Sequence, residues 1–141
     1  MGMYTELDIQ INIDPTKADL LKSLMDFLLD GSTIPSNLPD HPFFKCDRAP
    51  GFLSRLNGFG GAKSQLIEEY EWSLILTIDI CLKNYDHEIQ KFLDWIFPYT
   101  IHEGKDDDPR LVGCYRYEED EYYSSVFQIS NGFKISQNPF Y

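Results

Sequence analysis

Alternating apolar and polar residues near the start of the chain predict a β-strand over residues 4–13. From Leu7 onward every second residue is Leu or Ile, and acidic or amide residues stand between them. This pattern indicates a half-buried strand with one wet face, as in antiparallel sheets. A longer apolar alternation predicts a second strand over residues 72–82, and Ile75 and Cys81 on its more polar face indicate a central strand.

Two stretches with apolar residues at helical spacing predict amphipathic helices. The first begins at Asp14-Pro15, where an N-cap precedes a proline that the first turn tolerates, and it ends at Gly31. The second begins at the capping groups of residues 84–86 and ends before Pro98. The apolar stripes are Leu20, Leu21, Leu24, Phe27 and Leu28 in the first helix and Ile89, Phe92, Leu93 and Ile96 in the second.

The remaining segments predict turns and shorter strands. Several prolines make residues 31–61 irregular, although residues 43–48 favour a short strand there. The glycine-rich residues 57–61 are typical of a turn that joins two antiparallel strands. Further along, the pattern predicts strands over 111–117, 122–129 and 133–135, with a solvated turn at 118–121 and a hairpin turn at Asn131-Gly132.

The order of these elements predicts an α+β fold, with a single antiparallel or mixed β-sheet and two helices packed on one face. Residues 1–141 are expected to form a single α+β domain, because 141 residues with 43% apolar side chains match one globular unit. No apolar run reaches the roughly 18 residues of a membrane span, so we expect no membrane association and a cytoplasmic protein. The three cysteines have neither disulfide nor zinc spacing, which predicts reduced thiols.

The charge balance of the chain disfavours some classes of binding partner. Twenty-three acidic against twelve basic side chains give a net charge of −11. A protein that binds phosphates needs the opposite balance, so direct nucleic-acid binding and adhesion to anionic membranes are disfavoured. Residues 103–121 hold eight acidic against three basic side chains, whereas residues 40–65 hold four basic against two acidic ones. The molecule is therefore expected to have an acidic end.

No motif in the sequence indicates catalysis, a cofactor or a metal. Residues 58–64 are similar to a phosphate-binding loop, but Asn57 and Ala62 occupy two positions where that loop requires glycine. The acids that follow His102 are contiguous, unlike the alternating ligands of a calcium-binding loop, and adjacent loop acids are usually just solvated. The serines lie in no nucleophile elbow, and Cys46 lacks a convincing histidine partner. We therefore expect a binding protein rather than an enzyme, with no cofactor.

Tyrosines interleave with the acids of the acidic end. Tyrosine combines apolar area with a hydroxyl group and is enriched at protein interfaces. This predicts a docking face for a basic protein, whose association the negative charge would speed. The alternative is that the acids keep the protein soluble while the tyrosines pack on the sheet. The expected binding residues are Asp106, Asp107, Asp108, Glu118, Glu119, Asp120, Glu121, Tyr115, Tyr117 and Tyr122.

Three stretches in order along the chain carry a resemblance. They are HPFFKCDR at 41–48, KNYDHEI at 83–89 running on to FLDWI at 92–96, and GCYRYEE at 113–119. In these stretches the chain resembles small uncharacterised accessory proteins encoded by phages and prophages. The resemblance assigns no catalytic residue. It implies a phage context, in which acidic proteins of this size inhibit host enzymes or defence systems by occupying sites built for nucleic-acid phosphates.

These observations predict a small acidic phage-type accessory protein that acts by protein binding in the host cytoplasm. The expected target is a host nucleic-acid-handling or defence enzyme, inhibited through phosphate mimicry. One alternative is an immunity protein against a basic toxin nuclease. Another is a small-ligand-binding protein or metal-dependent enzyme that uses residues 40–65, where Lys45, Arg48 and Arg55 would meet an anion in a concave pocket.

Overall fold

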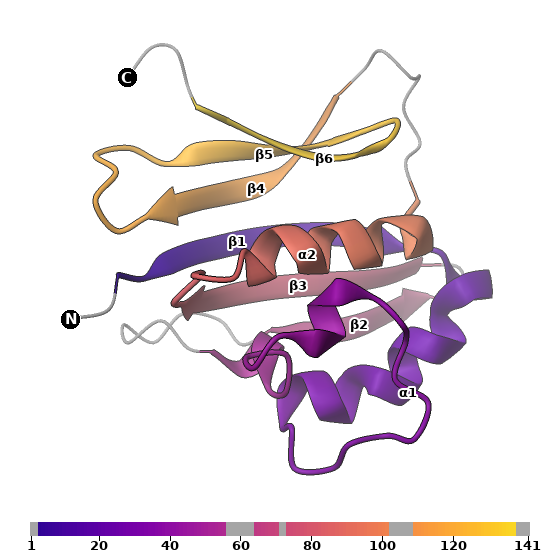
Figure 1. Ribbon diagram of the computed structural model, residues 1–141. Helices are drawn as coiled ribbons and strands as arrows, with labels where there is room; N and C mark the ends of the chain where they lie inside the picture. The colour runs from indigo at the N-terminus through magenta and orange to yellow at the C-terminus, as the bar shows by residue number, and fades with distance from the viewer. Residues whose placement is uncertain (1–2, 56–63, 71–72, 102–108, 138–141) are drawn as a thin grey trace.

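Six strands form one antiparallel sheet in a computed structural model, which describes residues 3–55, 64–70, 73–101 and 109–137 (Figure 1). The strand order is β2-β3-β1-β4-β5-β6, and every neighbouring pair runs antiparallel. The strands are β1 (Thr5–Ile13), β2 (Gln65–Tyr70), β3 (Ser73–Leu82), β4 (Arg110–Tyr117), β5 (Ser124–Ile129) and β6 (Gly132–Gln137). The predicted α+β fold with a single sheet is confirmed.

Each of the two central strands precedes a helix in the chain: β1 is followed by α1 (Ala18–Leu29), and β3 is followed by α2 (Glu88–Ile96). The unit β1-α1-β2 leaves a gap between its strands that β3 fills, and the unit β3-α2-β4 leaves a gap that β1 fills. This is the split β-α-β arrangement. The hairpin of β5 and β6 then extends the sheet beyond β4 (Figure 1).

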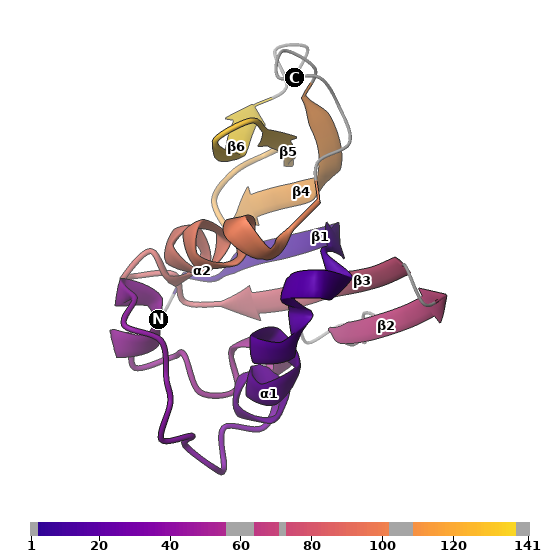
Figure 2. The ribbon, with the colours of Figure 1, turned by 90° about the vertical axis from the view of Figure 1, so that its right-hand side faces the viewer.

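Both helices lie on the same face of the sheet, as Figures 1 and 2 show from two directions. Alternate residues of β1 point into the core beneath them, and these are almost fully buried: Leu7, Ile9, Ile11 and Ile13. The residues between them face the other way, onto a side that neither helix covers, which we call the open face. Among the described residues, no helix is long and apolar enough to cross a membrane.

The predicted caps position both helices. Asp14 Oδ1 accepts a hydrogen bond from the backbone N–H of Thr16 at 2.9 Å, which starts a short 3₁₀ turn ahead of α1. Asn84 Oδ1 accepts from the backbone N–H of Ile89 at 2.8 Å, so the start of α2 is fixed next to the end of β3. Gly31 follows α1 with φ at +74°, a conformation that favours glycine.

Residues 42–45 form a 3₁₀ helix, so the short strand expected over residues 43–48 is wrong. His41 Nδ1 accepts a hydrogen bond from the backbone N–H of Phe43 at 3.1 Å, and Pro42 pre-sets the first helical turn. The ring of Phe43 is fully buried and lies 5.2 Å from that of Phe92 in α2. The aromatic residues of this segment therefore complete the core instead of extending the sheet.

Strand β2 is a strand that the alternation along the chain does not predict. Its apolar residues Leu66 and Ile67 are adjacent, so neither a two-residue nor a helical period stands out. It lies at the edge of the sheet and pairs with β3. The turn expected at 57–61 lies outside the described residues.

Strands β1 and β4 approach each other closely at Gly113. A Cβ atom at this position would lie 2.0 Å from the carbonyl oxygen of Asp8 and 2.7 Å from the Cα of Ile9. On its other side β4 shifts register against β5 between Leu111 and Gly113, which marks a β-bulge. The absence of a side chain at Gly113 therefore allows β4 to pair with β1 beside Asp8.

Candidate protein-binding surface

The turn between β4 and β5 carries four consecutive acids, at residues 118–121, and is tied to the start of the first strand. The backbone N–H of Glu118 donates to the carbonyl of Tyr4 at 2.9 Å, and Glu118 Oε2 accepts from the backbone N–H of Tyr4 at 3.0 Å. Arg116 Nε donates to the carbonyl of Asp120 at 3.0 Å. The turn predicted at 118–121 is thus braced at both sides, and it holds three exposed acids and the half-buried Asp120 at one end of the sheet.

The open face carries three more carboxylates on the two central strands. Asp8 of β1 lies directly opposite Asp79 of β3, and Glu6 follows two residues away on the same side of β1. Like charges directly opposite on neighbouring strands destabilise a sheet. Together with the turn, these residues form what we call the acidic surface: Glu6, Asp8, Asp79, Glu118, Glu119, Asp120 and Glu121.

Two free, half-buried cysteines lie on the open face, and the nearby carboxylates affect the pKa of both thiols. Burial raises the pKa of the Cys81 thiol, and the carboxylates of Glu6, Glu118 and Asp79 raise it further. Burial also raises the pKa of the Cys114 thiol, and the three open-face carboxylates add to that rise. Glu118 of the turn and the open-face carboxylates Glu6 and Asp79 therefore act on the same thiol.

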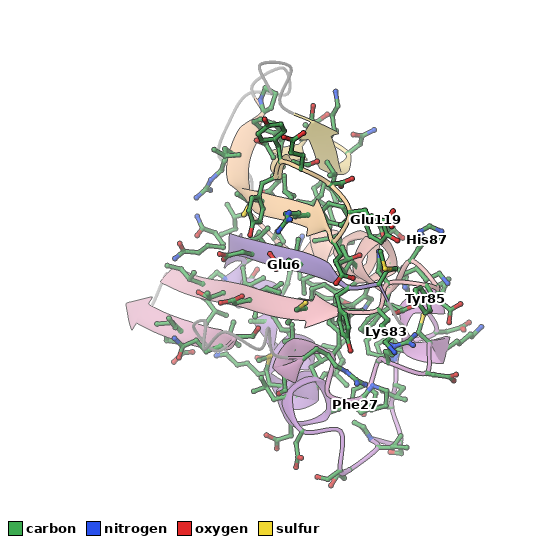
Figure 3. The ribbon with its side chains drawn as sticks, turned by 90° about the vertical axis from the view of Figure 1, so that its left-hand side faces the viewer. Glu6, Phe27, Lys83, Tyr85, His87 and Glu119 are labelled. Carbon is green, nitrogen blue, oxygen red and sulfur yellow. The ribbon has the colours of Figure 1, made fainter. Side chains whose placement is uncertain are left out.

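Tyr123 connects the turn to the open face. Its Oη donates a hydrogen bond to Glu6 Oε2 at 2.8 Å, and the guanidinium of Arg116 lies 5.5 Å from the centre of its ring. The hydrogen bond to Glu6, and then burial, raises the pKa of the Tyr123 phenol. Figure 3 looks onto this end of the molecule, with Glu6 on the sheet and Glu119 in the turn.

Two of the expected tyrosines lie on the other side of the sheet. Tyr115 stands opposite Leu7 and packs against the core, and Tyr117 stands opposite the buried Thr5. They help to line a cavity of about 250 Å³ at the same end of the sheet, which we call the tyrosine pocket. Its walls include Asn84, Tyr85, His87, Gln90, Tyr115 and Tyr117.

The structure therefore brings together some of the expected binding residues and separates others. The four turn acids lie together, and Tyr122 follows them with 47% of its surface exposed. Tyr115 and Tyr117 face the helix side, while Asp106, Asp107 and Asp108 lie outside the described residues. The open-face acids Glu6, Asp8 and Asp79 are additional members of the surface.

The sequence contained a signal for these additional acids. Glu6 and Asp8 occupy the polar positions of the alternation that predicts β1, so their exposure on a wet face could be expected. Their proximity to Asp79 could not, because it depends on the register between two strands that are far apart in the chain.

Arg48 in the basic segment 40–65 contacts α2. Arg48 Nη1 lies 3.6 Å from Oε2 of Glu88, whose side chain is fully buried, and the guanidinium lies 5.6 Å from the centre of the Tyr85 ring. At the other end of the same stretch, His41 Nε2 lies 3.0 Å from Asp94 Oδ2. The stretch 41–48 is therefore fastened along α2 by a polar contact at each end, with the buried Phe43 between them.

Two further cations of that segment, Lys45 and Arg55, also have contacts within the chain, while Lys63 lies outside the described residues. Lys45 Nζ lies 3.4 Å from Asp40 Oδ1 at an exposed site. Arg55 is half-buried, and one of its Nη atoms donates to the carbonyl of Pro50 at 3.4 Å. Burial raises the pKa of the Cys46 thiol, which disfavours its thiolate form.

The described part of the chain contains no candidate metal site. Within residues 3–55, 64–70, 73–101 and 109–137, no group of three or more His, Cys, Asp or Glu side chains could hold a metal ion. Comparison with protein-family models, with curated proteins and with solved structures finds no match.

Proposed function

We propose that this chain is a non-catalytic binding protein that docks its acidic surface onto a basic protein. In this proposal it is a phage-type accessory protein, and the target is a host nucleic-acid-handling or defence enzyme whose phosphate-binding groove it occupies. The observation that carries the proposal is the arrangement of Glu6, Asp8 and Asp79 on a sheet face without a helix over it. The four turn acids extend that arrangement to the end of the sheet.

The placement of two like charges in the sheet supports a functional reading of these acids. Asp8 and Asp79 stand directly opposite each other on β1 and β3. Sequences that depart from local stability rules at a few positions tend to do so at functional sites. A surface that only maintains solubility needs acids, but it does not need them directly opposite one another.

The geometry of a strand also suits mimicry of a phosphate backbone. Successive side chains on one face of a strand, such as Glu6 and Asp8, lie about 6.6 Å apart. A DNA strand also carries its phosphates in a regular row, one per axial rise of about 3.4 Å. Binding of single-stranded nucleic acid to a sheet face relies instead on stacked aromatic rings and cations, and the cation opposite Glu6, Arg116, is already engaged with Asp120 and the Tyr123 ring.

Capture of bacterial proteins on the immobilised chain tests the proposal. Capture would be carried out at about 50 mM and about 300 mM salt, since attraction between exposed charges weakens as the Debye length shortens. We expect basic nucleic-acid-binding proteins at low salt, and we expect duplex DNA to displace them. The test variant is Glu6→Gln with Asp8→Asn, which should lose these proteins.

A matched variant controls for net charge. Asp19→Asn with Asp26→Asn removes the same number of charges from exposed positions on α1, so it should retain the captured proteins. Two results would contradict the proposal. One is an absence of bound protein at low salt, and the other is equal loss of binding in both variants, which would mean that only total charge matters.

A further inference from the structure

The tyrosine pocket lies beside the acidic turn but is separate from the open face. Tyr85 comes from the segment between β3 and α2, and Tyr115 and Tyr117 come from β4. Figure 3 shows Tyr85 and His87 at the same end of the molecule as Glu119. The volume of about 250 Å³ lies below the range of about 300–1,000 Å³ that is typical of pockets for drug-sized ligands. A single side chain suits a pocket of this size better than a nucleotide or a cofactor.

The walls of the pocket are aromatic and polar, with oxygen acceptors. Asn84 Nδ2 donates to Gln90 Oε1 at 2.8 Å, and Gln90 Nε2 in turn lies 3.4 Å from Tyr115 Oη. The two amide groups thus have partners within the wall. A hydroxyl oxygen has two lone pairs, so the Tyr115 hydroxyl can accept a second hydrogen bond from a ligand. No lysine or arginine is among the residues that line the described pocket.

The surroundings of the pocket favour a cation. Burial raises the pKa of the Tyr117 phenol, and Glu119, Tyr85, Glu118 and Asp120 raise it further. Glu118, which also acts on Cys81 of the open face, therefore acts on this pocket together with Glu119 and Asp120. A positive group that enters the pocket would be attracted by these carboxylates, while an anion would be repelled.

Tyrosine rings at this end of the molecule already hold cations of the chain itself. The guanidinium of Arg48 lies 5.6 Å from the Tyr85 ring centre, that of Arg116 lies 5.5 Å from Tyr123, and Lys83 Nζ lies 5.7 Å from Tyr4. These distances are within the range of cation–π attraction. Of the described cations, none is recorded over Tyr115 or Tyr117.

We propose that the tyrosine pocket receives the guanidinium group of one arginine of the basic partner, which stacks on Tyr117 and donates to the oxygens of the wall. This inference rests on the proposed function and identifies an anchor for the partner. Arginine suits the site better than lysine, because its planar fork of donors stacks on aromatic rings while it forms hydrogen bonds. Buried arginine and tyrosine residues are enriched among the contacts that dominate interface energy.

Titration with N-acetyl-arginine methylamide, followed by the backbone amide signals of the protein in NMR, tests the pocket directly. We expect shifts at residues 84–90 and 115–117 and a dissociation constant in the millimolar range. N-acetyl-citrulline methylamide has nearly the same shape without the charge, and it should bind about five- to tenfold more weakly, as expected when a cation–π contact is lost.

Three variants distinguish loss of the Tyr117 ring from a general effect on the fold. Tyr117→Leu removes the ring and should weaken binding of the arginine probe about fivefold, whereas Tyr117→Phe keeps the ring and should stay within about twofold. Ile34→Ala removes an exposed apolar side chain that does not line the pocket and should leave the affinity unchanged. Equal affinity for both probes, unchanged affinity in Tyr117→Leu, or shifts confined to the open face would overturn the inference.

The arginine probe and the double variant Glu6→Gln with Asp8→Asn distinguish this inference from the proposed function. If the probe fails to bind but Glu6→Gln with Asp8→Asn still abolishes capture of basic proteins, the docking surface stands and the arginine pocket is wrong. If the probe binds the pocket but that double variant captures as well as the original chain, the arginine pocket stands and docking on the open face is wrong.

Discussion

Replacement of Asp8 by Asn is expected to stabilise the protein, because Asp8 faces two like charges. Side chains directly opposite on antiparallel strands have Cβ atoms about 4.5–5.5 Å apart, and this is the relation of Asp8 to Asp79. Glu6 stands two residues away on the same strand, at about 6.6 Å. Asparagine is nearly isosteric with aspartate, so the change removes charge while it leaves packing intact.

The expected gain follows from Coulomb's law. With the dielectric constant of water, each of the two repulsions amounts to about 0.7 kcal/mol. A Debye length of about 8 Å at physiological salt reduces each by roughly half. The free energy of unfolding of Asp8→Asn should therefore rise by about 0.7 kcal/mol, which corresponds to about 2 °C in Tm for a chain of this length.

Urea unfolding measures this gain, since urea is uncharged and does not screen the repulsion as guanidinium chloride would. The gain should nearly vanish at 1 M salt, where the Debye length is about 3 Å. A double-mutant cycle with Asp79→Asn isolates the pair, and the gain from Asp8→Asn should be roughly halved in that background. Destabilisation by Asp8→Asn, or a gain that persists at 1 M salt, would refute the electrostatic reasoning.

Three further predictions concern other parts of the molecule. Gly113→Ala should destabilise the fold by about 3 kcal/mol, because the new Cβ would lie 2.0 Å from the carbonyl oxygen of Asp8. A thermal unfolding curve that matches that of the original chain would contradict this close approach. Arg48→Met should lower the free energy of unfolding by about 3 kcal/mol, because it leaves the buried carboxylate of Glu88 without its cation. An equal loss of stability in the double variant with Glu88→Met would argue against an ionic origin. Because the pKa of the Cys81 thiol is raised, its alkylation by iodoacetamide at pH 8 should be slower than that of a free thiol, and the rate should increase as pH rises. Mass spectrometry follows the reaction, and a rate equal to that of free cysteine would disprove the shift.

The elements that follow a strong local period could be predicted from the sequence. Strand β1, both helices and the hairpin of β5 and β6 each have a pattern within a short window, although the hairpin loop is Ser130-Asn131, one residue before the expected Asn131-Gly132. The capping roles of Asp14 and Asn84 depend on neighbours within a few residues. Strand β2 lacks such a period and is held by its pairing with β3. The segment 42–45 has strand-like aromatic residues, but His41 and Pro42 direct it into a 3₁₀ turn.

The candidate site was predictable only where its residues are consecutive. The turn acids 118–121 stand together in the chain, so their clustering needs no knowledge of the fold. The opposition of Asp8 and Asp79 depends on strand order and register. The side of the sheet on which Tyr115 and Tyr117 lie depends in the same way on which residues of β4 pair with β1, and no property of the tyrosines themselves determines it.

The position of β1 between β3 and β4 has a consequence for synthesis of the protein. Strand β1 is made first, but its two partners are residues 73–82 and 110–117, so most of the chain must leave the ribosome before β1 has neighbours on both sides. Contacts between residues so distant in sequence make folding slow, because a large loop must close before they form. A nascent or truncated chain that ends before β4 would expose an unpaired edge of β1 to other chains, so we expect it to depend on chaperones or to aggregate.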